Sequence, residues 1–457
     1  MNSDQDPQRD ITAEGLRVGI GFPSAVMLVM GGIVGVGIFV NPAVVARSLH
    51  SPGLVLAAWI LGGVIALLGA FVYGELAARI PATGGEYVYI RDTFGPLAGF
   101  LFGWTTLLVV QAGGQAAVAI VFAKNLNVLL GGAMSERVVV VAVLAGLAGI
   151  NCIGVKSGNG VQTTLGTLKV AAIAALIVAG LLFAPHIAFL QPVTAKAAPL
   201  DALKTFGAAM IPVVFSYGGW QTANYVAGEM RDSRRNLARA LLVGVFAVIA
   251  LYLLVNVACL RTLGVDALGK TLTPASDVLQ RVAGPIGAKL AAAAIALSAL
   301  AFMSQGMLTG PRVTFAMARD GLFFRGAASV GETSHVPVIA ILLQAAWTGV
   351  LALSGSYEQI LSYVIAMNFL FFGLSASCLF VLRRRERAAG AVGAPDGFRA
   401  PWHPWTTGLF ILACVAVVGC SFWAYPVDSL IGYAILFLGV PPYLYWRRKN
   451  LSETSRP

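Results

Sequence analysis

Apolar residues occur along the chain in long blocks that are separated by short polar segments. A helix needs about 20 mostly apolar residues to cross a bilayer, and most of these blocks reach that length. The polarity does not alternate at every second residue, as it would in a membrane barrel. The pattern therefore predicts an all-α polytopic membrane protein. We expect twelve transmembrane helices, over residues 21–46, 53–79, 96–124, 137–155, 161–184, 205–229, 237–262, 284–318, 336–354, 357–382, 405–424 and 428–446.

Composition and charge agree with this class of protein. Hydrophobic residues make up 58% of the chain and charged residues only 11%, whereas soluble domains carry about 25% charged residues. The net charge of +11 does not indicate a nucleic-acid partner, because the basic residues stand at the ends of the apolar blocks. With the N-terminus inside, 21 Lys and Arg residues fall on the inner side and 9 on the outer side. The positive-inside rule then places both termini in the cytoplasm of a multi-pass protein of the cell membrane.

The sequence offers little for enzymatic chemistry. It has no phosphate-binding loop, no HExxH pair and no catalytic triad signature. The five cysteines show no paired spacing, so we interpret them as small core residues. No cluster of His, Asp or Glu occurs at depth within an apolar block. We therefore expect neither an enzyme nor any cofactor or metal.

Two apolar blocks are interrupted by glycine. The first contains four glycines within seven residues, between Gly31 and Gly37, and each glycine weakens a helix by about 1 kcal/mol relative to alanine. The sixth contains Gly218 and Gly219 beside aromatic residues, with Pro212 just before them. Either segment alone is also typical of close helix packing.

The two interruptions lie five spans apart, each in the first helix of a five-helix set. Paired interruptions of this kind are typical of transporters built from inverted repeats. Unwound segments offer N–H groups to a carboxylate and carbonyl oxygens to an ammonium group, which suits a zwitterionic amino acid. The expected organisation is a cytoplasmic tail, two five-helix repeats, two additional helices and a second tail, at residues 1–20, 21–184, 205–382, 405–446 and 447–457.

Several segments together resemble the amino acid–polyamine–organocation superfamily, and within it the bacterial relatives of the L-type amino acid transporters. The resemblance covers nearly the whole chain. Its carriers are residues 31–39 with Asn41-Pro42, residues 73–76 and 81–87, Phe94-Gly95-Pro96 through Trp104, Asn151-Cys152 with Val155-Lys156, residues 167–169, residues 215–220, and Gly310 and Arg312 with residues 318–321.

The resemblance implies a five-plus-five inverted repeat with broken helices one and six, and it assigns a substrate site. Backbone N–H groups would hold the carboxylate, at Ile33, Val34, Gly35, Val36 and Gly37. Carbonyl oxygens would hold the amino group, at Ile33, Phe215, Ser216 and Gly218, with the ring of Phe215 as an outer lid. Trp220, Gln221 and Asn224 would border the pocket for the side chain.

The chain also departs from this pattern. Val36 stands where the family often has a hydroxyl residue, and Gln221 stands where the L-type branch often has Asn. The segment Asn125 to Arg137 lacks the cysteine through which the eukaryotic light chains bond to a heavy chain. We therefore expect no disulfide-linked heavy chain, and a monomer or weak homo-oligomer in the lipid bilayer.

Three ionisable residues within or near the spans are candidates for function. Lys169 lies in an apolar stretch, where a charge is costly unless it is paired or faces water; it could also snorkel to the edge. The resemblance implies that its ammonium group contacts the unwound part of span one and takes the place of sodium. Glu75 and Glu229 could form an inner gate with Arg79, Arg231 or Arg235, or be ordinary charges at helix ends.

These observations favour a sodium-independent secondary transporter of neutral L-amino acids, an exchanger or facilitator that works by alternating access. Span three has Gln111 and Gln115 but no acidic residue to pair with Lys169, which weighs against proton symport. A polyamine or cationic amino acid carrier would need acidic residues beside the interruptions, and none lies there. Both remain alternatives at this stage.

Overall fold

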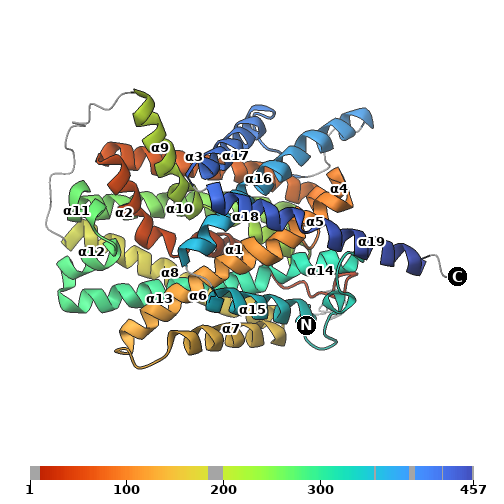
Figure 1. Cartoon of the computed structure of the whole chain (residues 1–457), viewed down its shortest axis with the longest axis horizontal. Helices are drawn as coiled ribbons and strands as arrows, with labels where there is room; N and C mark the ends of the chain where they lie inside the picture. Colours follow the sequence, from red (N-terminus) through yellow and green to blue (C-terminus); the bar gives the residue numbers. More distant parts are fainter. Residues whose placement is uncertain (1–10, 184–198, 355–356, 391–396, 425, 455–457) are drawn as a thin grey trace, which may run out of the picture.

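The computed structural model describes residues 11–183, 199–354, 357–390, 397–424 and 426–454, and these residues form helices and two isolated β-bridges (Figure 1). Proline at the first helical position starts α3, α5, α13 and α14, where its missing N–H is not needed. The elements in chain order are α1 (Phe22–Ile33), α2 (Gly37–Leu49), α3 (Pro52–Arg79), α4 (Glu86–Phe94), α5 (Pro96–Thr105), η2 (Thr106–Val110), α6 (Gln111–Leu129), α7 (Glu136–Ile153), α8 (Val155–Val178), η3 (Ala179–Phe183), α9 (Pro199–Ser216), η4 (Trp220–Glu229), α10 (Ser233–Leu263), α11 (Val265–Lys270), α12 (Pro274–Ala283), α13 (Pro285–Thr309), α14 (Pro311–Arg319), η5 (Arg325–Ala328), α15 (Val338–Ser354), α16 (Tyr357–Ala388), α17 (Trp405–Ala424), α18 (Pro426–Phe437) and α19 (Val440–Thr454).

The all-α prediction is confirmed for the described residues, but the number of spans is confirmed only in part. Within the described ranges, nine helices are long and apolar enough to cross a membrane, and α1 with α2 gives up to ten as one bent span. The expected sixth span corresponds to α9 and η4, and the expected ninth corresponds to α15, a shorter apolar helix. The count of twelve therefore remains a prediction.

The helices form two groups that meet at the broken helix. In one group α3 packs on α10, α1 packs on α10 and η4, and α2 packs on α9. In the other group α13 packs on α6 and α8, and α15 packs on α6 and α7. α1 also contacts α8 and α13, so the break between α1 and α2 lies where the groups meet. α16 and α17 pack on each other, and α16 also contacts α6 (Figure 1).

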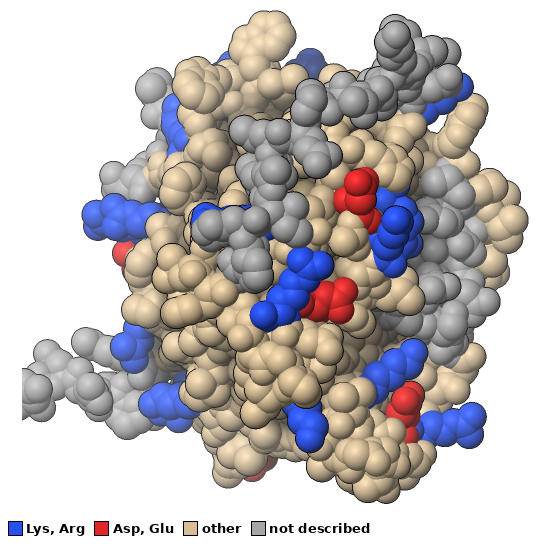
Figure 2. Space-filling view, turned by 90° about the vertical axis from the view of Figure 1, so that its left-hand side faces the viewer, with Lys and Arg blue, Asp and Glu red and all other residues tan. Residues whose placement is uncertain are grey.

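One end of the molecule is closed by short elements. α4, α14 and α19 lie toward the right of Figure 1, whereas α2, α11 and α12 lie toward its left. The N-terminal segment joins α14 and η4, because Glu14 forms an ion pair with Arg319 and the N–H groups of Gly19 and Ile20 donate to the Glu229 carbonyl. The opposite end, seen in Figure 2, has Lys, Arg, Asp and Glu scattered over a largely uncharged surface.

Candidate functional site

The first break separates α1 from α2. The two helices meet at 42°, and Val34, Gly35 and Val36 lie between them. The N–H group of Gly35 donates to the Ile33 carbonyl at 2.8 Å. In the described part of the chain, the N–H groups of Val36, Gly37 and Ile38 find no backbone acceptor. Unpaired N–H groups at the start of a helix attract an anion, so the start of α2 has the local geometry of an anion-binding helix end.

The second break separates α9 from η4. α9 ends at Ser216 and η4 begins at Trp220. Gly219 has a φ of +106°, which residues other than glycine rarely adopt. A Cβ atom on Gly219 would lie 2.0 Å from the Gly32 carbonyl oxygen, and one on Gly32 would lie 2.4 Å from the Gly219 oxygen. The two breaks are therefore in direct backbone contact, which only glycine permits.

Side chains from neighbouring helices hold the breaks together. The hydroxyl group of Tyr252 in α10 lies 3.1 Å from the carbonyl oxygens of both Ile33 and Ser216 and shares its one proton between them. The amide nitrogen of Asn41 in α2 donates to the Ser216 hydroxyl at 2.7 Å and to the Pro212 carbonyl at 3.0 Å. Two of the carbonyl oxygens exposed by the unwinding are thus occupied by protein donors.

Lys169 lies against the first break from α8 and is fully buried. Its Nζ donates to the Gly31 carbonyl at 3.0 Å and to the Val34 carbonyl at 2.5 Å. The contact with the unwound part of span one, which the resemblance implied, is therefore present. A further donor from the same group of helices, the hydroxyl of Ser298 in α13, lies 3.1 Å from the Gly35 carbonyl.

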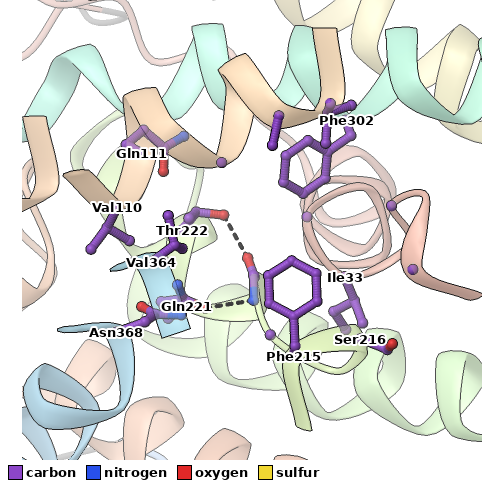
Figure 3. A pocket seen from close by; sticks show the side chains of 18 of the residues that line it. Ile33, Val110, Gln111, Phe215, Ser216, Gln221, Thr222, Phe302, Val364 and Asn368 are labelled. Carbon is purple, nitrogen blue, oxygen red and sulfur yellow. Dashed lines mark hydrogen bonds between the residues drawn. The ribbon is translucent and has the colours of Figure 1, made fainter. Parts of the chain in front are cut away.

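A cavity of about 80 Å³ opens between the two breaks and the facing helices. A site needs about 10–15 Å³ by this measure for each water molecule, so the space suits a molecule of a few heavy atoms. In Figure 3, Phe215 and Phe302 lie near each other on one side of the cavity, with Gln111, Val110, Val364 and Asn368 across from them. The lining residues are Gly32, Ile33, Gly35, Val36, Gly37, Val110, Gln111, Gly114, Ala117, Val118, Phe215, Ser216, Gly218, Gly219, Gln221, Thr222, Phe302, Gln305, Val364, Asn368 and Phe369.

The structure brings most of the predicted substrate-binding residues to this cavity. The lining includes Ile33, Gly35, Val36, Gly37, Phe215, Ser216, Gly218 and Gln221, whereas Val34, Trp220 and Asn224 are not among it. Trp220 packs edge-on against Tyr73, with ring centroids 4.8 Å apart, and stacks on Phe372 at 5.4 Å. The amide nitrogen of Asn224 donates to the Gln221 carbonyl at 2.9 Å. In this conformation Trp220 and Asn224 therefore contact other residues of the protein and do not line the cavity.

Most of the residues that other helices contribute to the lining were not predicted from the sequence. Three of them carry amides: Gln111 in α6, Gln305 in α13 and Asn368 in α16. The Nε2 of Gln305 donates to the Thr222 hydroxyl at 2.6 Å, and the Nε2 of Gln111 donates to the Gly306 carbonyl at 3.2 Å. The available signal in the sequence was an amide side chain within an apolar span. Of these three residues, only Gln111 had been noted for it.

Glu75 and Glu229 belong to separate ion pairs. Glu75 contacts Arg79 at 2.7 Å and Arg383 at 2.5 Å, so α3 is tied to α16. Glu229 accepts two bonds from Arg312 in α14, at 2.7 and 2.8 Å, and both side chains are fully buried. The partner of Glu229 is therefore neither Arg231 nor Arg235, which the sequence prediction had named.

Comparison with known proteins shows the family of this chain. A family model described as amino acid permease matches residues 20–441. The chain belongs to the amino acid permease family. It is 31% identical to the serine/threonine exchanger SteT of Bacillus subtilis (strain 168), over 96% of this chain and 99% of that protein.

Animal transporters are similar along nearly the same length. This permease is 30% identical to the large neutral amino acids transporter small subunit 2 of Mus musculus, over 98% of this chain and 86% of that protein. It is 28% identical to the mouse Asc-type amino acid transporter 1, over 95% of this chain and 82% of that protein. These matches confirm the superfamily resemblance and the prediction of a transporter.

Proposed function

We propose that this permease is a sodium-independent exchanger or facilitator of neutral L-amino acids in the cell membrane. The observation that carries the proposal is the cavity between two broken helices, with unpaired N–H groups at the start of α2 and no charged side chain among the described lining residues. The N–H groups of Val36 and Gly37 hold the α-carboxylate, and the carbonyl oxygen of Gly218 takes the amino group. The Phe215 carbonyl already accepts the Gly218 N–H at 3.0 Å and offers its second lone pair. The uncharged lining gives no partner to a second positive charge.

Lys169 takes the role of a fixed cation beside the substrate site. Its ammonium group satisfies two carbonyl oxygens of the unwound segment, at Gly31 and Val34. Exposed carbonyl oxygens at a broken helix are where sodium-coupled carriers bind their ion. With these oxygens occupied, the substrate site forms without sodium, which supports sodium-independent transport.

Transport proceeds by alternating access, in twelve spans of which ten form an inverted repeat. The group with α1, α2, α3, α9, η4 and α10 moves against the group with α6, α7, α13 and α15. The end that carries α4, α14 and α19 faces the cytoplasm, because the N-terminal segment and Arg383 to Arg387 lie there. The buried pair of Glu229 and Arg312 closes that end and acts as the inner gate. Glu75 belongs to a separate group of ion pairs with Arg79 and Arg383.

Uptake into liposomes tests the proposal. The purified protein is reconstituted in liposomes loaded with an unlabelled neutral amino acid or left empty, and uptake of labelled serine, threonine, leucine, alanine, lysine and putrescine is measured. We expect uptake of neutral amino acids that is faster into loaded liposomes and equal in sodium and choline buffers. Uptake of lysine or putrescine alone favours a cationic carrier, and no uptake of any compound contradicts the proposal.

A further inference from the structure

One carboxyl group is buried outside the substrate cavity and has no ion-pair partner among the residues that the structure describes. Glu86 begins α4, and it is 1% exposed. Its carboxylate accepts hydrogen bonds from the hydroxyl groups of Tyr73 at 2.5 Å, Tyr225 at 3.0 Å and Ser375 at 3.2 Å. These donors come from α3, η4 and α16, so a single side chain joins four elements.

The surroundings of Glu86 contain titratable groups, but these are neutral at ordinary pH. Tyr89 lies on its own helix, Cys378 on α16 and Cys414 on α17, and each of them interacts electrostatically with Glu86. Tyr73 and Tyr225 complete the set on α3 and η4. A buried carboxylate without a cation is costly, because it loses its hydration without an opposite charge in return.

Several charged residues of the same elements are engaged with other partners. On α4, Arg91 pairs with Asp92 and Asp320. On α3 and α16, Glu75 is bound by Arg79 and Arg383, and Arg385 donates to the Asp92 and Thr93 carbonyls. On η4, Glu229 is bound by Arg312. Burial therefore dominates, and it raises the pKa of Glu86 to about 7.

The position of Glu86 connects it to the substrate cavity. Tyr225 stands on η4, which also supplies Gln221 and Thr222 to the lining. Directly before α4, the Gly84 N–H donates to the Tyr225 carbonyl at 2.9 Å, and Gly85 has a positive φ of 48°. A Cβ atom on Gly85 would lie 2.8 Å from the backbone of Asn224. η4 cannot move away from α4 without breaking the contacts of Glu86.

We propose that Glu86 is a proton-binding site that couples cytoplasmic pH to the opening of the permease. The proton keeps the carboxyl group neutral, and η4 then stays packed on α4 and α16. When the proton leaves, water stabilises the carboxylate, so the ionised form favours the conformation in which η4 separates from α4. This coupling rests on the proposed transport function and on the cytoplasmic placement of α4, whereas proton binding at Glu86 does not.

Exchange assays at different pH values test the coupling. We compare the wild type, Glu86→Gln and Glu136→Gln in liposomes whose two sides are buffered equally between pH 5.5 and 8.5. Glu136 is an exposed acid at the start of α7 and serves as the control. We expect the wild type and the control to speed up at least threefold through a midpoint near pH 7. Glu86→Gln stays at the low-pH rate throughout, because the amide cannot ionise. A flat wild-type profile, or a Glu86→Gln profile like that of the wild type, overturns the proposal.

A second variant covers the case in which Glu86→Gln does not fold. Tyr225→Phe removes one of the hydroxyl donors to the carboxylate and keeps the ring. Because hydrogen bonds stabilise the ionised form, its loss shifts the midpoint of the exchange profile upward by at least half a pH unit. A midpoint equal to that of the wild type contradicts the assignment of the titration to Glu86.

Thermal unfolding without substrate separates this inference from the transport function. The pKa of about 7 lies above the ordinary value of 4.5, so the folded protein binds an additional proton between these pH values. Its stability is therefore greatest below this window and falls as the pH rises through it. From pH 5 to pH 8, we expect the melting temperature of the wild type to fall by several degrees relative to that of Glu86→Gln. A constant difference contradicts proton binding at Glu86 whether or not any amino acid is transported.

Discussion

The backbones of Gly32 and Gly219 are in contact, so that a Cβ atom on Gly219 would lie 2.0 Å from the Gly32 carbonyl oxygen. The two residues are distant in sequence. Gly32 lies in the last turn of α1, just before the first break, and Gly219 lies within the second break. This contact sets the distance between the two breaks, and residues of both breaks line the same cavity.

The first prediction is that Gly219→Ala destabilises the permease by at least about 2 kcal/mol, because strained backbone at positive φ and a steric clash add together. Thermal unfolding in detergent measures the loss. The control is Gly160→Ala, at an exposed position in α8 where no atom lies within 4 Å of the added Cβ. We expect the control to melt at the wild-type temperature or above it. Equal melting temperatures for the two variants would show that the breaks do not meet as described.

The second prediction concerns the carboxylate-binding end of α2. Gly37 lines the cavity, and a Cβ atom on it would lie 2.9 Å from the Ser216 hydroxyl oxygen, so Gly37→Leu adds a bulky side chain at the edge of the cavity. We expect this variant to fold but to lose amino acid binding, measured by equilibrium binding of a labelled substrate. Gly160→Leu carries the same change at an exposed site and should bind as the wild type does. Binding by Gly37→Leu at wild-type affinity would misplace the carboxylate.

The third prediction tests the role of Lys169. Lys169→Met keeps an unbranched side chain that is one atom shorter, and it leaves the carbonyl oxygens of Gly31 and Val34 without this donor. Each lost partner costs about 1–3 kcal/mol, so we expect uptake to fall at least roughly tenfold. Uptake by the wild type should be equal in sodium and choline buffers. Uptake by the wild type that requires sodium would refute the role of Lys169.

The fourth prediction uses a double-mutant cycle on Glu229 and Arg312. Removing either partner alone leaves a buried charge unpaired, so Glu229→Leu and Arg312→Met should each cost about 3–5 kcal/mol. The double variant should recover most of the stability, because an apolar pair has no unpaired charge. If the pair closes the cytoplasmic end, the double variant should still exchange amino acids slowly, because apolar groups resist hydration on opening. Exchange at the wild-type rate would remove Glu229 from the gate.

Much of the fold follows from the sequence because the apolar blocks are constrained by the membrane itself. The blocks predicted at 53–79 and 405–424 coincide within a residue with α3 and α17. The breaks were equally readable, since clustered glycines stand at residues 31–37 and 218–219. The sixth span was harder to predict, because η4 is not continuous with α9 and neither is a candidate span by itself among the described residues.

The side-chain half of the site could not be predicted, because it depends on which helices meet. Gln305 and Asn368 are amides within apolar stretches, and only the packing of α13 and α16 brings them to the cavity. Trp220 stands beside the second break, but its ring packs on Tyr73 and Phe372 instead of lining the cavity. Glu86 was not predicted as a functional residue, because its environment depends on hydroxyl groups that three other elements supply.

The central claim is that the two breaks bind the backbone of an amino acid, and competition binding tests it most directly. Labelled threonine is bound to the purified protein and displaced with threonine, with its methyl ester, which lacks the carboxylate, and with the matching hydroxy acid, which lacks the amino group. The account predicts displacement by threonine and at least about a hundredfold weaker displacement by either analogue. Displacement by both analogues at the same concentrations as threonine would contradict it.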